Sequence, residues 1–180
     1  MKTNVSIVSI LLLALTVATA TQARAQVGWS SIARGCVYDT TNLASIAVFQ
    51  GSVFFSADGS GHIKLICPVQ GIFGVPQNFV NDLVITFYND NGFEGGVDHC
   101  SIEAHLFRTN LNNIEAGADI TTITTAGRAF TGRQTLDRGL PEFLNFDTSY
   151  YWVDIDMFRD SGSATCHPEF VGTYLTQIIF

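Results

Sequence analysis

One stretch near the end of the chain places aromatic rings and carboxylates at a spacing of two residues. It runs from Tyr150 to Phe158 and reads Tyr-Tyr-Trp-Val-Asp-Ile-Asp-Met-Phe. Because successive side chains of a β-strand point to opposite faces, one face would carry Tyr150, Trp152, Asp154 and Asp156. Rings stack on the apolar faces of sugars, and carboxylates accept hydrogen bonds from sugar hydroxyls. We predict that these four residues bind a ligand, either a carbohydrate or another protein. The alternative is that a loop or a second copy of the chain covers them.

The opposite face of the same stretch predicts a core strand. Its apolar residues are Tyr151, Val153, Ile155 and Met157. The carboxylates of a glycosidase flank the scissile bond from two sides, whereas Asp154 and Asp156 would point the same way from one strand. We therefore assign no catalytic residue and favour a non-enzymatic module that is surface-associated and has a binding or structural role. A metal-dependent or carboxylate-based hydrolase is an alternative.

A glycine-rich loop over residues 89–98 offers the oxygen ligands that Ca²⁺ takes. Asp90, Glu94 and Asp98 would supply its charge. Their spacing does not match an EF-hand loop, which needs ligands at alternate positions and a closing glutamate. An ordinary hairpin loop is therefore favoured, calcium is the alternative, and no cofactor is predicted.

A second group of metal-ligating residue types follows in residues 99–106. Alternation puts four polar residues on one strand face: His99, Ser101, Glu103 and His105. The residues between them, Cys100, Ile102, Ala104 and Leu106, would face the core. Neighbours two apart on a strand are roughly 6–7 Å from each other, so zinc there would need a ligand from a third element. A solvated strand face is favoured over a metal site.

Four cysteines predict two disulfides. They are Cys36, Cys67, Cys100 and Cys166. An even count in an exported chain is typical of disulfides, and the Cys-x-x-Cys pair of a zinc site is absent from the sequence. Three connectivities are open. Cys36–Cys67 with Cys100–Cys166 is favoured because strands that follow one another in sequence are often neighbours in space.

Residues 1–25 are predicted to be a secretory signal peptide. Lys2 gives a positive start, residues 5–20 are mostly apolar, and Ala23-Arg24-Ala25 fits the cleavage pattern. Residues 26–180 are then predicted to form one domain in the periplasm or outside the cell. No later apolar run is long enough to predict a membrane-spanning helix. Removing two basic residues makes this domain more acidic than the formal net charge of −7, which disfavours a nucleic-acid partner.

The rest of the chain is a series of short runs rich in β-branched and aromatic residues. Glycine, asparagine and aspartate separate the runs, and no helical period occurs after residue 25. This pattern predicts an all-β domain, an antiparallel, jelly-roll-like β-sandwich of about eight to nine strands. The predicted strands are 36–40, 44–56, 61–68, 82–88, 97–108, 120–125, 128–136, 149–159 and 169–180.

A family resemblance rests on the strand that ends in Cys67-Pro68-Val69. An early cysteine, a Cys-Pro-Val strand, a mid-chain cysteine that opens a strand and a late cysteine occur in that order. With the late Tyr-Tyr-x-Val strand, this order resembles small exported bacterial proteins of uncharacterised function. The resemblance spans most of residues 26–180 and implies a disulfide-supported β-sandwich. It implies no catalytic residue.

The C-terminal residues raise a further alternative, a small outer-membrane β-barrel. Phe170, Tyr174, Ile178 and Phe180 resemble the aromatic side of a closing barrel strand, and the chain is long enough for eight strands. Against it, four cysteines are atypical of such barrels, and residues 82–88 are apolar on both faces, as in a sandwich core.

Self-association is a further possibility. If Tyr150 and Trp152 are exposed, they would form an apolar patch through which two copies of the chain could associate.

Overall fold

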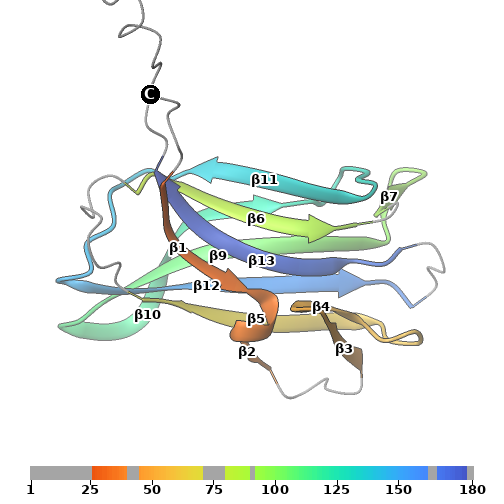
Figure 1. Ribbon diagram of the computed structural model, residues 1–180, viewed down its shortest axis with the longest axis horizontal. Helices are drawn as coiled ribbons and strands as arrows, with labels where there is room; N and C mark the ends of the chain where they lie inside the picture. The colour runs from red at the N-terminus through yellow and green to blue at the C-terminus, as the bar shows by residue number, and fades with distance from the viewer. Residues whose placement is uncertain (1–25, 40–44, 71–79, 90–91, 162–165, 178–180) are drawn as a thin grey trace, which may run out of the picture.

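The computed structural model in Figure 1 describes residues 26–39, 45–70, 80–89, 92–161 and 166–177. The predicted signal peptide, the calcium candidate Asp90, and the C-terminal Ile178 and Phe180 lie outside these ranges. Within the described ranges, no helix is long and apolar enough to cross a membrane.

The described part of the chain forms thirteen strands, more than the eight or nine predicted. They are β1 (Gln26–Ile32), β2 (Val37–Tyr38), β3 (Ile46–Phe49), β4 (Ser52–Phe55), β5 (Gly61–Val69), β6 (Asp82–Tyr88), β7 (Phe93–Glu94), β8 (Val97–Asp98), β9 (Cys100–Asn110), β10 (Asn113–Thr124), β11 (Arg133–Gly139), β12 (Ser149–Arg159) and β13 (Glu169–Gln177). A short 3-10 helix, η1 (Ala33–Gly35), follows β1. The extra strands are β1, a second strand within the predicted run 44–56, and the two-residue strands β7 and β8.

Two antiparallel sheets make up the sandwich. The five-stranded sheet has the order β10-β9-β12-β5-β2, and the other has the order β11-β6-β13-β4-β3, with β1 also paired to β13. In Figure 1 the two sheets lie one in front of the other, with their long strands running in similar directions. The strands β7 and β8 form a separate small hairpin. The predicted all-β antiparallel sandwich is confirmed.

The core lies between the two sheets and takes alternate residues from each strand. On β12 the predicted core face is confirmed, because Tyr151, Val153, Ile155 and Met157 are all buried. They pack in one cluster with residues of the other sheet, including Phe87 and Phe170. Burying a large apolar side chain contributes about 1.5–3 kcal/mol. Successive side chains of a strand point to opposite faces. Since one set of residues on β5, β9 and β12 is buried in the core, the residues between them lie on the outer face of the five-stranded sheet.

Both disulfides have the favoured connectivity. Cys36 is bonded to Cys67, and Cys100 to Cys166. The first bond joins neighbouring strands, since Val37 of β2 pairs with Ile66 of β5. The second connects the start of β9 in the five-stranded sheet to the segment that leads into β13 in the other sheet. Disulfides of this kind are typical of exported proteins.

The prediction of one strand over residues 44–56 is wrong. These residues form a hairpin of β3 and β4, and the chain reverses at Gln50 and Gly51, which have positive φ values of 48° and 95°. Gly51 is a usual turn residue and Gln50 is not, and apolar residues continue on both sides of this two-residue turn, so the break in the sequence is short. The predicted strand at 128–136 starts later, at Arg133, and β1 was not predicted.

Candidate functional site

The outer face of the five-stranded sheet presents two rows of polar and apolar side chains. Strand β12 lies between β5 and β9, so its outward residues from Trp152 to Phe158 have a partner on both sides. The first row is Ile66, Asp154 and His105, and the second is Lys64, Asp156 and Glu103. Directly opposed residues of antiparallel strands have Cβ atoms about 4.5–5.5 Å apart. The register therefore brings together carboxylates and basic groups from three separate parts of the sequence.

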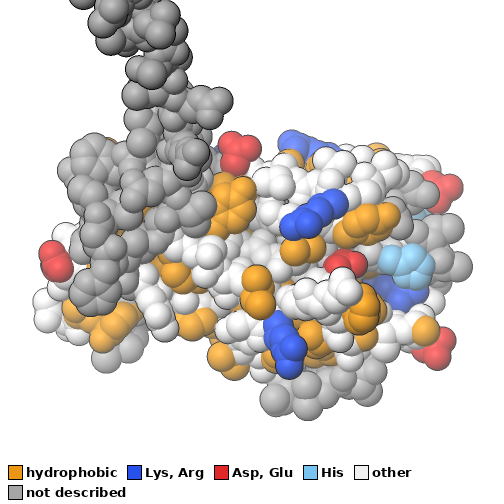
Figure 2. All heavy atoms as spheres, in the orientation of Figure 1, with side chains coloured by type: hydrophobic (Ala, Val, Ile, Leu, Met, Phe, Trp, Pro, Cys, Tyr) orange, Lys and Arg blue, Asp and Glu red, His pale blue; other side chains and the backbone are white. Residues whose placement is uncertain are grey.

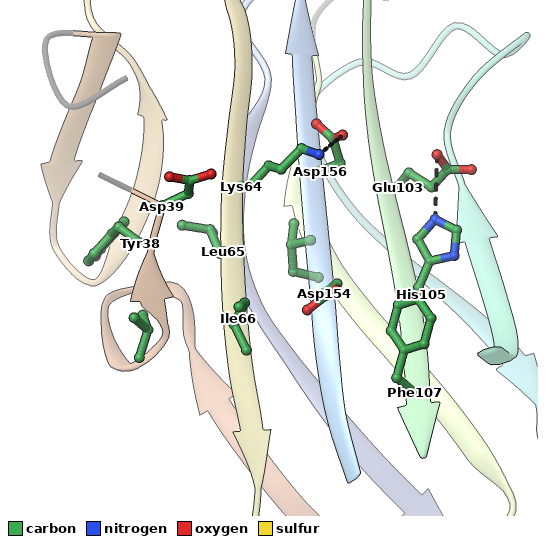
Figure 3. Close-up of a pocket in the computed structure, with 12 residues that line it drawn as sticks. Tyr38, Asp39, Lys64, Leu65, Ile66, Glu103, His105, Phe107, Asp154 and Asp156 are labelled. Atoms are coloured by element: carbon green, nitrogen blue, oxygen red, sulfur yellow. Dashed lines mark ion pairs between the residues drawn. The ribbon is translucent and has the colours of Figure 1, made fainter. Parts of the chain in front are cut away.

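These rows form the floor of an open hollow with a volume of about 380 Å³. Tyr38 and Asp39, at the end of β2, stand on one side of it, and Phe107 of β9 stands on the other. Figure 3 shows these side chains across four neighbouring strands, with Asp154 and Asp156 on the strand between Lys64 and Glu103. The hollow thus combines aromatic and aliphatic surface with four carboxylates, one lysine and one histidine.

His105 is held among acidic groups. Its Nδ1 lies 2.8 Å from Asp119 Oδ2, and its Nε2 lies 3.5 Å from Glu103 Oε2. The hydroxyl of Thr122 donates to the same oxygen of Asp119 at 3.0 Å. Burial acts to lower the pKa of His105, but the hydrogen bonds and charges of Asp119 and Glu103 outweigh it and raise the pKa above the ordinary 6.5. His105 is therefore fixed in orientation and biased toward its protonated form.

Asp156 and Asp154 differ in their partners. Asp156 is 2.8 Å from Nδ1 of His62 and 3.9 Å from Nζ of Lys64. In contrast, Asp154 Oδ1 is buried and has no hydrogen-bond partner among the described residues. Burial raises the pKa of Asp154, and this is opposed by the charge of His105, a hydrogen bond from Trp152 and the charge of Lys64. The Asp154 carboxylate is the group in the hollow that lacks a full set of partners.

Only two of the four predicted ligand-binding residues lie in the hollow. Asp154 and Asp156 line the hollow, whereas Tyr150 and Trp152 do not. Tyr150 is 65% exposed. The Trp152 ring stacks on Phe107, with centroids 5.5 Å apart and planes 16° apart, and Phe107 stacks in turn on His105 at 5.8 Å. Trp152 thus supports the wall of the hollow through Phe107.

The metal candidates that the structure describes are not gathered into one site. Glu94 is exposed, and the Asp98 carboxylate accepts a hydrogen bond of 2.7 Å from the backbone N–H of Gly127. His99 Nδ1 lies 3.6 Å from Asp160 Oδ2, whereas Glu103 and His105 line the hollow. Within the described ranges, no three His, Cys, Asp or Glu side chains form a group able to hold a metal ion.

Several residues that line the hollow were not predicted from the sequence. Lys64 and Ile66 alternate with buried residues on β5, so their outward orientation was readable from the pattern. Their position beside β12 was not, because strand pairing over about 90 residues leaves no local signal. Tyr38 and Asp39 come from a strand of only two residues and its end, which carries even less pattern.

No protein-family model matches the chain, and no curated protein sequence is similar to it. Similar solved structures include TmCBM61 in complex with beta-1,4-galactotriose, at 13% identity and a TM-score of 0.44 over 83% of this chain and 87% of that one. The Emp46p carbohydrate recognition domain in its potassium-bound form has 11% identity and a TM-score of 0.46 over 87% and 100% of the two chains. The xylan-binding module CBM15 has 12% identity and a TM-score of 0.43 over 83% and 97%. Because these TM-scores and identities are low, the similar structures do not indicate a function for this chain. The residues that line the hollow do.

Proposed function

We propose that the protein is an exported, non-catalytic β-sandwich module that binds a glycan on the outer face of its five-stranded sheet. The observation that carries the proposal is the hollow of about 380 Å³, in which rings and aliphatic side chains stand beside charged hydrogen-bonding groups. The two disulfides support export, because such bonds persist in oxidising compartments.

The chemistry of the hollow suits a sugar. A pyranose ring has apolar C–H faces and a rim of hydroxyls, so it needs apolar contact and hydrogen-bond partners close together. Tyr38, Ile66 and Phe107 supply the apolar surface, and the carboxylates of Asp154 and Asp156 accept hydrogen bonds from hydroxyls. Lys64 donates. A purely apolar ligand would remove water from these charged groups and offer them no hydrogen bond in return, which is costly.

The length of the hollow favours an oligosaccharide over a single sugar. It extends across β2, β5, β12 and β9, and neighbouring strands are about 4.8 Å apart. Three such spacings give a floor about 14 Å long. Its open shape on a sheet face also lets a chain enter and leave at both ends.

The arrangement of the carboxylates favours binding over hydrolysis. Asp154 and Asp156 project from the same face of one strand, in neighbouring rows. A glycosidase needs one carboxyl group on each side of the scissile bond. We therefore assign these two residues to recognition.

A pair of matched arginine substitutions tests the proposal. Ile66 is 47% exposed within the hollow, and Val48 is 45% exposed on the edge strand β3 of the other sheet. Both variants should fold, because both side chains are largely at the surface. On a glycan array, Ile66→Arg should lose the glycans that the wild-type protein binds, because the long side chain occupies the hollow. Val48→Arg should keep them.

Two results would contradict the proposal. The first is a wild-type protein that binds no glycan on a broad array. The second is equal binding by the wild-type protein and Ile66→Arg, which would place any glycan site elsewhere on the molecule.

A further inference from the structure

The charge balance of the hollow and the state of Asp154 point to a more specific ligand. We infer that the hollow binds a cationic glycan, and that the protonated amine of an amino sugar pairs with the carboxylate of Asp154. This inference rests on the proposed glycan-binding function and names the class of glycan.

The hollow carries more acidic than basic side chains. Asp39, Glu103, Asp154 and Asp156 line it, against Lys64 and His105. The excess of negative charge remains even when His105 is protonated. Since the whole chain is also acidic, with a formal net charge of −7, the surrounding field does not offset it. Glycans that carry carboxylate or sulfate groups are repelled, and cationic glycans are attracted.

Asp154 is the carboxylate in the hollow whose existing contacts satisfy it least. Asp156 already contacts His62 and Lys64, and Glu103 contacts His105. Asp154 Oδ1, in contrast, has no hydrogen-bond partner among the described residues. Its contacts are a hydrogen bond from Trp152 and the charges of His105 and Lys64, and its partly exposed side chain lines the hollow. A buried carboxylate oxygen without a partner is unfavourable, and a charge-assisted hydrogen bond from an ammonium group to the exposed part of the carboxylate is about twice as strong as a neutral one. A ligand amine therefore gains more at Asp154 than a hydroxyl does.

The aromatic walls favour the same ligand. Tyr38 and Phe107 line the hollow on its two sides. The face of an aromatic ring attracts a cation, and more strongly when the cation is partly removed from water. Rings and carboxylates around one hollow thus act together on an ammonium group, whereas a neutral sugar uses only the apolar contact of the rings.

The test compares three β-1,4-linked glucose-type oligosaccharides of equal length that differ at one position. They carry an amine (de-N-acetylated chitooligosaccharide), an acetamide (chitooligosaccharide) or a hydroxyl (cello-oligosaccharide) at C2. Isothermal titration calorimetry at pH 6 and low salt should show the amine compound binding at least about tenfold more tightly than the other two, which corresponds to about 1.4 kcal/mol. Added salt should reduce this preference, because it screens the ion pair.

An isosteric variant isolates Asp154. Asp154→Asn should lose most of the preference for the amine compound over the hydroxyl compound, because it keeps the shape of the side chain and removes its charge. Asp58→Asn, at an exposed turn residue that does not line the hollow, should keep the preference. Thermal melts of both variants establish that they are folded.

Each contrary outcome has a distinct meaning. Equal binding of all three oligosaccharides by the wild-type protein would overturn the cationic ligand and leave the glycan-binding function standing. Failure to bind any of them, together with an empty glycan array, would overturn both. Oligolysine binding as tightly as the amine oligosaccharide would show that charge alone is recognised, and would overturn the amino-sugar assignment.

Discussion

At Asp154 a carboxylate is held in the floor of a hollow without a partner for one of its oxygens. Burial raises its pKa, so the ionised form is less stable in the folded protein than in the unfolded chain. The ionisable group costs no stability at a pH below its ordinary value of 3.8, where it is neutral in both states. The cost grows as the pH rises from 3.8 to the raised pKa and is fully present above it. Groups whose pKa is shifted by burial and by nearby charges cluster at functional sites.

This leads to a prediction about stability. Asp154→Asn should raise Tm at pH 7 relative to the wild-type protein, by a few degrees at most, because the carboxylate is partly exposed and solvent screens its charge. The difference should disappear as the pH is lowered below 3.8, where the wild-type side chain is also neutral. Thermal melts of both proteins across this range measure it. A variant less stable than the wild-type protein at pH 7 would contradict this account of Asp154.

The residues of the hollow could be only partly predicted from the sequence. Asp154, Asp156, Glu103 and His105 were all selected as candidates, but under separate hypotheses of sugar and metal binding. The register that pairs Asp154 with His105 joins them in one site, and this register depends on the packing of the whole sheet. Lys64 was missed for the same reason. Local alternation predicts the face of a strand on which a residue lies, but not the strand beside it.

Among the strands, β12 and its neighbours provide the rigid support of the site. The ring of Trp152 on β12 stacks on Phe107 of β9, and Gly117 of β10 lies against the same ring. A Cβ built at Gly117 would come within 2.8 Å of Trp152 Cζ2 and would also overlap with Cη2. The absence of a side chain at Gly117 therefore allows the Trp152 and Phe107 rings to keep their positions beside the hollow.

We accordingly predict that Gly117→Ala displaces Trp152. The overlap should lower the free energy of unfolding by about 1–3 kcal/mol, as for other overpacked sites, and should change the near-ultraviolet circular dichroism of the tryptophan. Gly139→Ala is a suitable control, since a Cβ there would meet no atom closer than 3.8 Å. Equal stability of the two variants in urea denaturation would show that Gly117 is not needed for the position of Trp152.

Two elements could be predicted over their whole length. Residues 149–159 alternate strictly, residues 82–88 are a short apolar run, and both form strands over the predicted ranges. The favoured pairing of the cysteines is also confirmed. The hairpin of β3 and β4 was missed because its turn is only two residues long, Gln50 and Gly51, and lies between two apolar runs. The short strand β2 was predicted within a longer run, and β1 was not predicted. Such elements are stabilised by neighbouring strands more than by their own sequence pattern.

On the scale of the whole molecule, the two outer sheet faces differ. The outer face of the five-stranded sheet has the larger hollow, of about 380 Å³. A smaller one, of about 190 Å³, lies beside β3, β4, β6, β11 and β13 and is lined by residues that include Phe49, Tyr88 and Arg133. In the view of Figure 2, hydrophobic and charged side chains are interspersed over the surface. The difference in size and in carboxylate content favours the five-stranded sheet as the binding face.

The central claim is that a glycan binds in the hollow on that sheet. The most direct test is to titrate isotope-labelled protein with the oligosaccharide that binds best and to follow backbone amide chemical shifts by NMR. We predict that the changes concentrate on β2, β5, β12 and β9, around Lys64, Asp154 and Phe107, while Arg133 and its neighbours on β11 are unaffected. Changes centred on the six-stranded sheet, or no change with any glycan, would contradict the claim.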